Sequence, residues 1–289
     1  MKNDIPLYAI EHLKLYKNEG VLVSRFGYYA NLHQHLYTAH RHSFFHLVFF
    51  TAGSGTQQID FKKFAVKPGL IYFMIPGQVH RWDFETEPDG YIINFDKTYL
   101  STFLTDPNYL ENFSFFSGQT DLQVLELDEA TQNLIIPIFE EILAEGTDRL
   151  KIGDDLVKVL ILKLFIEVSR FSKQQKNSNI NLYSYTLLKN FQDLIAQNYA
   201  QIRLPKQYAV LLYITPNHLN ALCKDLLGIP AGAVIRERVV LEAKRLLINV
   251  DLTIAQIAEK LNFKDHSYFI KFFKKYEAIT PEKFRKNNT

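Results

Sequence analysis

Two stretches near the C-terminal end of the 289-residue chain place polar side chains beside a regular apolar stripe. In the later stretch, Phe269, Phe272 and Phe273 follow the i, i+3, i+4 spacing of a helix that buries one face. Side chains that leave such a stripe face solvent, and Asn and Lys there can hydrogen-bond to adenine and guanine in the major groove of DNA. The candidate DNA-binding residues are Asn217, His218, Asn220, Ala221 and Lys224 in the earlier stretch, and His266, Ser267, Ile270 and Lys271 in the later one, with Lys274 and Lys275 nearer the DNA backbone. For each of them, the alternative is an exposed position that contacts no base.

A helix-turn-helix would position these residues. The run from Ile254 to Leu261 has the spacing of a short amphipathic helix, Asn262 can adopt the left-handed conformation that ends it, and Asp265 is a good N-cap for the next helix. About fifty residues earlier, Thr215-Pro216 supplies an N-cap and a proline at the first position of the equivalent helix. The short turn and its repetition predict a duplicated helix-turn-helix.

The C-terminal region, over residues 182–287, resembles the DNA-binding domain of the AraC-type transcription regulators. The resemblance is carried by AKRLL (Ala243–Leu247), IAQIAEKLNF, SYFIKFFKKY and ITPEKFR. It implies seven helices that hold two helix-turn-helix units rigidly, with double-stranded DNA and RNA polymerase as partners. The chain departs from the family where Asn262 and Ala278 replace the usual Gly and His266 replaces a frequent Pro. Asn tolerates a positive φ better than Ala does, so Ala278 is the more consequential departure.

The charges of the chain are segregated. Residues 181–289 contain 16 Lys and Arg against 9 Asp and Glu, whereas residues 1–180 contain 17 against 22. A basic C-terminal half suits contact with phosphates. The single Cys223 excludes an intramolecular disulfide, and its place on an apolar stripe predicts a core residue. The chain shows no signal peptide and no apolar run long enough to span a membrane, so we expect a cytoplasmic protein.

The N-terminal hundred residues predict β structure, because short runs rich in Phe, Tyr, Ile and Val alternate with Gly, Pro and charged turns. The region resembles the cupin barrel found in many AraC-type regulators, through His40-Arg41-His42, Gly53 and the run from Pro76 to Trp82. We therefore expect an α+β chain. Its predicted parts are a cupin-like effector-binding and dimerisation domain at 1–171 (barrel about 20–100, irregular 101–127, helices about 128–171), a linker at 172–181 and a DNA-binding domain at 182–289.

The cupin resemblance also raises the question of a metal. Metal-binding cupins take two His and a Glu from their first motif and a His from their second, and the matching positions here are His40, His42, His46 and His80. Imidazoles of this kind can hold Zn²⁺ or Fe(II), which would make the protein a cupin metalloprotein or a metal-sensing regulator. Because the carboxylate position is His46, we favour the alternative that these histidines line a pocket or a surface, and we expect no metal and no cofactor.

Aromatic and polar residues of the predicted barrel could form a pocket for a small organic effector. The candidate pocket residues are His42, Phe44, Phe49, Tyr72, Phe73, His80 and Trp82, with Arg81 beside them. The chain has no catalytic triad, P-loop or dinucleotide fingerprint, so we expect no enzyme and no catalytic residues. We expect a DNA-binding transcription regulator controlled by an effector. A barrel that serves only as a dimerisation module is the remaining alternative, and the helix at Asp154–Phe171, apolar nearly all round, could pack on a second subunit of a homodimer.

Overall fold

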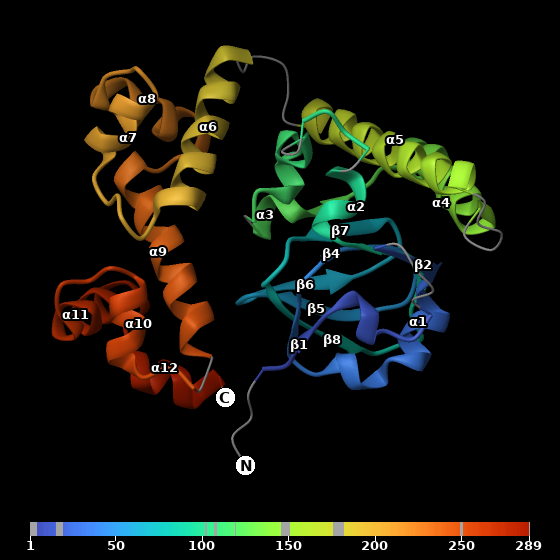
Figure 1. Ribbon diagram of the computed structural model, residues 1–289, viewed down its shortest axis with the longest axis horizontal. Coiled ribbons are helices and arrows are strands. Elements are labelled where there is room, and N and C mark those ends of the chain that lie inside the picture. The colour runs from blue at the N-terminus through green and yellow to red at the C-terminus, as the bar shows by residue number, and fades with distance from the viewer. Residues whose placement is uncertain are drawn as a thin grey trace. The chain divides into compact units, whose positions relative to one another are not determined.

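The structure is a computed structural model, and it describes residues 5–15, 20–101, 103–106, 109–118, 120–145, 151–175, 182–248 and 251–288. The chain divides into two compact units, one of Pro6–Ser178 and one that contains Asn179–Thr289. The first unit is rich in strands and the second is helical (Figure 1). The α+β class expected from the sequence is confirmed.

Two five-stranded sheets form the first unit (Figure 1). The first sheet has the order β1 (Leu7–Tyr8), β3 (His40–His42), β8 (Val79–Phe84), β5 (Gly55–Ile59) and β6 (Lys62–Val66). The second has the order β10 (Val124–Glu126), β7 (Leu70–Met74), β4 (Phe45–Ala52), β9 (Asp89–Phe95) and β2 (Val21–Arg25). The β1–β3 pair is parallel and the other pairs are antiparallel.

Several short elements differ from the sequence-based expectation. The segment 101–127, expected to be irregular, contains two 3₁₀ helices (Tyr109–Asn112 and Ser114–Phe116), α3 (Thr120–Gln123) and β10. The short helix α1 (Phe26–Leu32) packs against β9 and β2, and α2 (Lys97–Ser101) follows β9. Val124 of β10 lies opposite Tyr72 of β7. A three-residue strand is too short to show a period of two in the sequence, and it forms here by pairing along β7.

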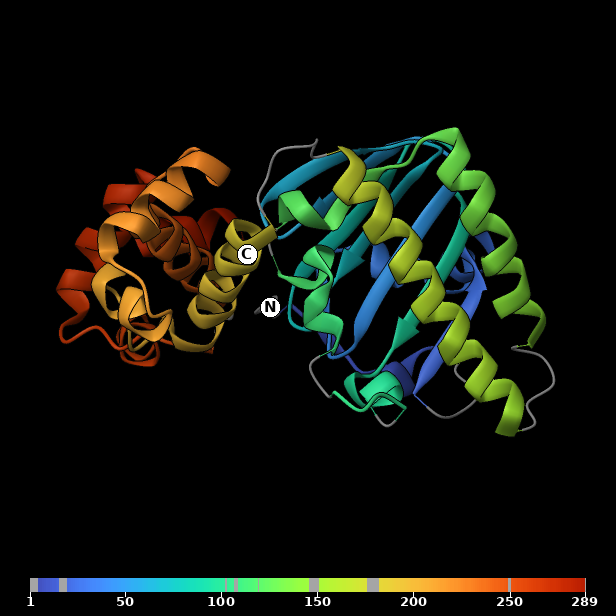
Figure 2. The same cartoon turned by 90° about the horizontal axis from the view of Figure 1, so that it is seen from above.

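The second sheet is apolar on both faces, and successive residues of its strands point to opposite sides. In β4, Leu47 and Phe49 join a core with α4 (Glu129–Glu145) and α5 (Lys151–Gln175), whereas Val48 and Phe50 join a second core between the two sheets. Figure 2 shows α4 and α5 lying across the outer face of this sheet. The sheet therefore separates two hydrophobic cores, one under the helices and one between the sheets.

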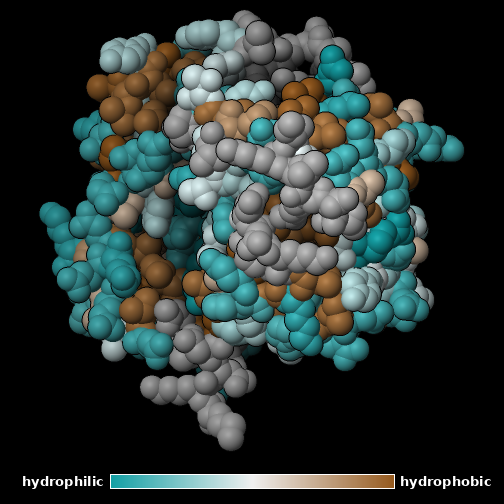
Figure 3. Space-filling model, turned by 45° about the vertical axis from the view of Figure 1, so that its right-hand side comes forward, coloured by the Kyte–Doolittle hydropathy of each residue, from teal (hydrophilic) through white to brown (hydrophobic). Residues whose placement is uncertain are grey.

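Helix α5 is longer than expected. It continues through the buried Ser172 to Gln175, so the first four residues of the predicted linker are helical. The remainder of that linker, residues 176–181, lies outside the described residues. On the outer side of the two helices, Leu134, Val159 and Ile166 are 47%, 47% and 40% exposed. Figure 3 shows another side of the molecule, on which hydrophobic residues are interspersed among hydrophilic ones.

The second unit contains the seven helices that the resemblance implies. They are α6 (Leu182–Asn198), α7 (Pro205–Leu211), α8 (Pro216–Leu227), α9 (Ala231–Leu247), α10 (Ile254–Lys260), α11 (His266–Glu277) and α12 (Pro281–Asn288). The α7–α8 and α10–α11 pairs are the two helix-turn-helix units, and α9 packs against both. Cys223 is buried in the core of the first of them, as expected.

The ends of the helices follow the expected capping. The Thr215 Oγ1 accepts a hydrogen bond from the His218 amide at 3.1 Å, and the Asp265 Oδ1 accepts one from the Ser267 amide at 2.8 Å. Asn262 has a φ of 55°, as expected of a residue that ends a helix in the left-handed conformation. At the ends of the two recognition helices, Gly228 and Ala278 have φ values of 74° and 60°.

Ala278 therefore occupies a backbone conformation that costs an L-residue about 1–2 kcal/mol. We expect Ala278→Gly to raise the free energy of unfolding by roughly 1 kcal/mol. The matched control is Gly228→Ala, which should lower the free energy of unfolding. A Cβ at Gly228 meets nothing within 4 Å, so only the backbone conformation opposes the substitution. Thermal and urea unfolding of the full chain, followed by circular dichroism, measures both changes. An Ala278→Gly variant that is less stable than the wild type would contradict this assignment of strain.

Candidate functional site

The first recognition helix, α8, exposes most of the residues expected to face DNA. Asn217, His218, Ala221 and Lys224 are exposed. The opposite side of the helix is buried, and it consists of Leu219, Leu222 and Cys223. The amphipathic pattern read from the sequence thus separates the exposed candidates from the core in the folded helix.

Asn220 is the exception on this helix. Its side chain is half-buried, and its Oδ1 accepts a hydrogen bond from the amide of Ala231 at 3.1 Å. Ala231 is the first residue of α9, whose N-cap is Pro230 without a capping side-chain hydrogen bond. Asn220 therefore satisfies one of the free amides at the start of α9, and its contact with DNA stays a prediction.

The second recognition helix, α11, exposes His266, Ser267, Lys271, Lys274 and Lys275. Ile270 is half-buried, so only part of its side chain is accessible. The buried side is formed by Phe269 and Phe273. Tyr268, which was not among the expected residues, is 62% exposed on the same helix. The residue next to Phe269 lies off the apolar stripe, so the helical spacing alone could have identified it.

Two arginine side chains connect segments of the second unit by hydrogen bonds to backbone carbonyl oxygens. The Arg285 side chain of α12 donates to the carbonyl oxygens of Leu247 at 2.9 Å and Leu252 at 2.6 Å, which ties the last helix to the segment before α10. Arg203, before α7, donates to the carbonyl oxygen of Leu261 and lies 4.3 Å from the centre of the Phe263 ring. The first helix-turn-helix is thereby joined to the turn of the second.

The buried region between the two sheets, hereafter the space between the sheets, is the second candidate site. Of the expected pocket residues, His42, Phe44, Tyr72, His80 and Trp82 are buried there together. Their side chains come from strands of both sheets and from the segment that joins β3 to β4.

Three expected pocket residues do not face this space. Phe49 and Phe73 belong to the core under the helices, where Phe49 stacks on Phe139 at 5.8 Å between ring centroids and Phe73 on Phe115 at 3.9 Å. Arg81 is exposed and its Nε donates to the Gln58 Oε1 at 3.1 Å. The error has one cause, because strand neighbours such as Tyr72 and Phe73 point to opposite faces and a list of aromatic residues does not separate them.

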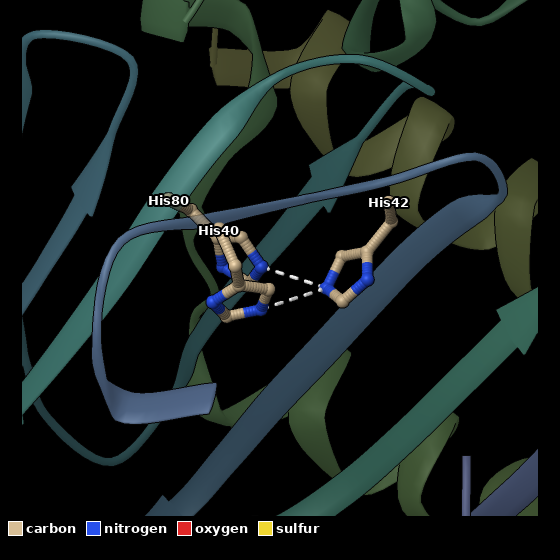
Figure 4. A group of neighbouring side chains, drawn as sticks. All are labelled: His40, His42 and His80. Atoms are coloured by element: carbon tan, nitrogen blue, oxygen red, sulfur yellow. Dashed lines mark hydrogen bonds between the residues drawn. The ribbon is translucent and has the colours of Figure 1, made fainter. Parts of the chain in front are cut away.

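Three of the four histidines in this space converge. The Nε2 atom of His42 lies 3.1 Å from that of His40 and 2.8 Å from that of His80 (Figure 4). All three side chains are buried. Burial lowers the pKa of His40 to about 4 and holds the pKa values of His42 and His80 well below the usual range. These imidazoles are therefore neutral at neutral pH.

His46, the fourth histidine considered as a metal ligand, has separate partners. Its Nδ1 donates to the Asn94 Oδ1 at 2.7 Å, and its Nε2 accepts from the Tyr72 hydroxyl at 2.9 Å. The Tyr72 oxygen in turn accepts from the Trp82 indole N–H at 3.1 Å. Burial lowers the pKa of His46 to about 3. Both of its nitrogens are satisfied, so the structure separates it from the cluster of His40, His42 and His80.

Comparison with known proteins identifies both units. Residues 22–159 match the model of the AraC-like ligand binding domain, and residues 208–287 match a helix-turn-helix domain model. The arabinose operon regulatory protein of Salmonella typhimurium is 23% identical over 239 residues, which cover 81% of this chain and 80% of that protein. The probable transcription factor PqrA of Proteus vulgaris is 39% identical over 72 residues, or 25% of this chain and 59% of its own.

Among solved structures, that of unsaturated fatty acid bound wild-type ToxT from Vibrio cholerae is similar, with 13% identity over 93% of this chain and 95% of that one and a TM-score of 0.42. In the part of the chain that the structure describes, no helix has the length and apolarity to cross a membrane. With a ligand-binding domain in its first unit and a helix-turn-helix domain in its second, this chain belongs to the AraC family of transcription regulators, which are DNA-binding proteins and not enzymes.

Proposed function

We propose that this regulator reads a specific DNA sequence with α8 and α11 and that a small organic effector, bound between its two sheets, alters its affinity for DNA. The ligand-binding model matches residues 22–159, which span the strands from β2 to β10. The observation that carries the effector site is the polar content of the space between the sheets. Among the described residues, no group hydrogen-bonds to the buried Nδ1 of His42. Since buried polar atoms are normally satisfied, a ligand with matching groups would gain hydrogen bonds at this place.

DNA reading rests on the exposed faces of the two recognition helices. Asn217 can form paired hydrogen bonds to adenine, and Lys271 can hydrogen-bond to guanine. Lys274 and Lys275, further along α11, are suited to phosphates. The arginine contacts and α9 hold the two helices in one unit, so both would meet the duplex together.

Two further partners follow from the family and the surface. RNA polymerase is proposed from the family alone. A homodimer is proposed because Leu134, Val159 and Ile166 leave apolar surface on the outer side of α4 and α5. The oligomeric state of the full chain, measured by sedimentation velocity, tests the second proposal.

The segment 182–289 should fold and bind DNA without the first unit, because it contains both helix-turn-helix units and α9. Its affinity should fall steeply with salt, since phosphate contacts release counterions. A protein that makes about 6–10 such contacts loses roughly 10³–10⁵-fold in affinity between about 50 and 200 mM salt. Fluorescence anisotropy of the fragment on a labelled duplex over a salt series measures this, and a salt-independent affinity contradicts the proposed interface.

Lys271→Ala should change the preferred DNA sequence, because Lys271 is exposed on the reading face of α11. Loss of a base contact costs about 1–3 kcal/mol of discrimination. The matched control is Lys286→Ala, which removes the same charge from an exposed position on α12. Selection of bound sequences from a random pool compares the two variants with the wild type. If Lys271→Ala selects the same sequence as the wild type, Lys271 does not read a base.

An effector that binds between the sheets should change DNA affinity in the full chain. A ligand can shift the equilibrium between two conformations of the protein only by the difference in its affinity for them. A panel of sugars and organic acids, titrated against the chain by calorimetry, identifies binders, and the DNA affinity is then measured with and without each. Trp82→Ala should weaken binding of the effector while Arg81→Ala should not, because Trp82 is buried between the sheets and Arg81 is exposed. A tight binder that leaves DNA affinity and subunit association unchanged would overturn the proposed control.

A further inference from the structure

The three converging histidines come from one face of two neighbouring strands. His40 and His42 are two residues apart on β3 and so point to the same side. His80 of β8 lies directly opposite His40 in the antiparallel register. One ligating nitrogen from each residue lies within 4.8 Å of the other two, and the side chains are 0%, 2% and 1% exposed (Figure 4).

The hydrogen atoms in this cluster cannot satisfy all of its contacts. The Nδ1 of His40 lies 2.8 Å from the carbonyl oxygen of Thr38, which can only accept, so this Nδ1 carries the hydrogen and the Nε2 carries a lone pair. If the His42 Nε2 carries a hydrogen, that single hydrogen faces both His40 and His80. If it carries a lone pair, that lone pair faces the one on His40 at 3.1 Å. In both cases at least one of the two close contacts lacks a well-formed hydrogen bond.

We propose that His40, His42 and His80 bind a divalent transition-metal ion of the zinc class through their Nε2 atoms. An ion at the centre would accept all three lone pairs and remove the conflict. Tetrahedral zinc with Zn–N bonds of about 2.0–2.1 Å requires its nitrogens to be roughly 3.3 Å apart. The two spacings to the His42 Nε2, 3.1 and 2.8 Å, are a few tenths of an ångström shorter than this, and the three ligand atoms all lie within 4.8 Å of one another.

The surroundings provide outer hydrogen bonds of the kind that orient metal-bound histidines. Thr38 already fixes the tautomer of His40. The Gln57 side-chain nitrogen lies 3.5 Å from the Nδ1 of His80, while the Gln57 Oε1 has no partner among the described residues. Turning this amide by 180° lets the oxygen accept from the His80 Nδ1–H, which leaves the His80 Nε2 free to bind the ion.

The donor set selects the type of ion. Three neutral imidazoles suit Zn²⁺ and its neighbours such as Cu²⁺, Ni²⁺ and Fe²⁺, whereas Ca²⁺ and Mg²⁺ prefer oxygen. Within the described residues, this cluster contains no carboxylate, which distinguishes it from the two-histidine, one-carboxylate set of non-haem iron enzymes. A three-histidine set leaves a coordination position open, and a water molecule or an oxygen of a bound effector can occupy it.

The test uses the full chain purified without a histidine tag and freed of metal with a chelator. Titration with Zn²⁺ in competition with a chromophoric chelator should give one tight site per chain, and Zn²⁺ should raise the melting temperature. Co²⁺ should give the strong visible absorption of a tetrahedral site. His42→Gln and His80→Gln should each abolish the tight site and the Co²⁺ spectrum.

Two controls separate the cluster from other histidines. His35→Gln removes an exposed imidazole of the same unit, and His46→Gln removes the buried one that has separate partners. Both variants should keep one tight site, and circular dichroism checks that every variant is folded. The proposal is overturned if the wild-type chain binds none of these ions tightly, or if folded His42→Gln retains the site. Loss of the site in folded His46→Gln would overturn the three-histidine assignment. Because DNA binding is not the readout, each of these results leaves the proposed DNA function standing.

Discussion

The first unit depends on one constraint, which is that the sheet β10-β7-β4-β9-β2 is apolar on both faces and neither face can be left in water. Burial of a large apolar side chain contributes about 1.5–3 kcal/mol, so both faces must be covered. Helices α4 and α5 cover the face that carries Phe49 and Phe73, and the first sheet covers the face that carries Phe50 and Tyr72. Strand β4 is buried on both faces, and for this reason its sequence shows no alternation of polar and apolar residues.

Because the region between the sheets is buried, a polar group there lowers the stability of the fold unless it has a hydrogen-bond partner. His46 is fully satisfied by Asn94 and Tyr72, so it can be read as a structural residue. The cluster of His40, His42 and His80 is not, and among the described residues nothing hydrogen-bonds to the His42 Nδ1. Unsatisfied polar atoms in a closed interior favour the binding of something that completes them. The proposed effector and the proposed ion would therefore share one region, and an ion with an open position could contribute directly to effector binding.

In the second unit, side-chain hydrogen bonds at helix ends add to a buried hydrophobic core. Thr215 and Asp265 cap the starts of the two recognition helices, and Asn220 caps the start of α9. Arg203 and Arg285 satisfy carbonyl oxygens around α10. The bonds of Asn220, Arg203 and Arg285 each join one element to another. They help to hold the exposed faces of α8 and α11 as parts of one body, which DNA reading by both helices requires.

The sequence by itself determined the family, the α+β class, the seven helices of the second unit and most of the exposed positions on α8 and α11. The family and the seven helices came from the resemblance of whole motifs. The helix-turn-helix units and the exposed positions followed from helical spacing, N-caps and residues tolerant of a positive φ, which are local properties visible in neighbours such as Phe269, Asn262 and Asp265. Only the tertiary structure decided the side-chain directions, hydrogen-bond partners and strand pairings that depend on residues far apart in the sequence. It turned Phe49 and Phe73 away from the space between the sheets, bonded Asn220 to α9, and paired β10 with β7. It also brought His80 against His40 and His42 while binding His46 elsewhere, because strand register and side-chain partners are set by packing across the sheets and not by spacing along the chain.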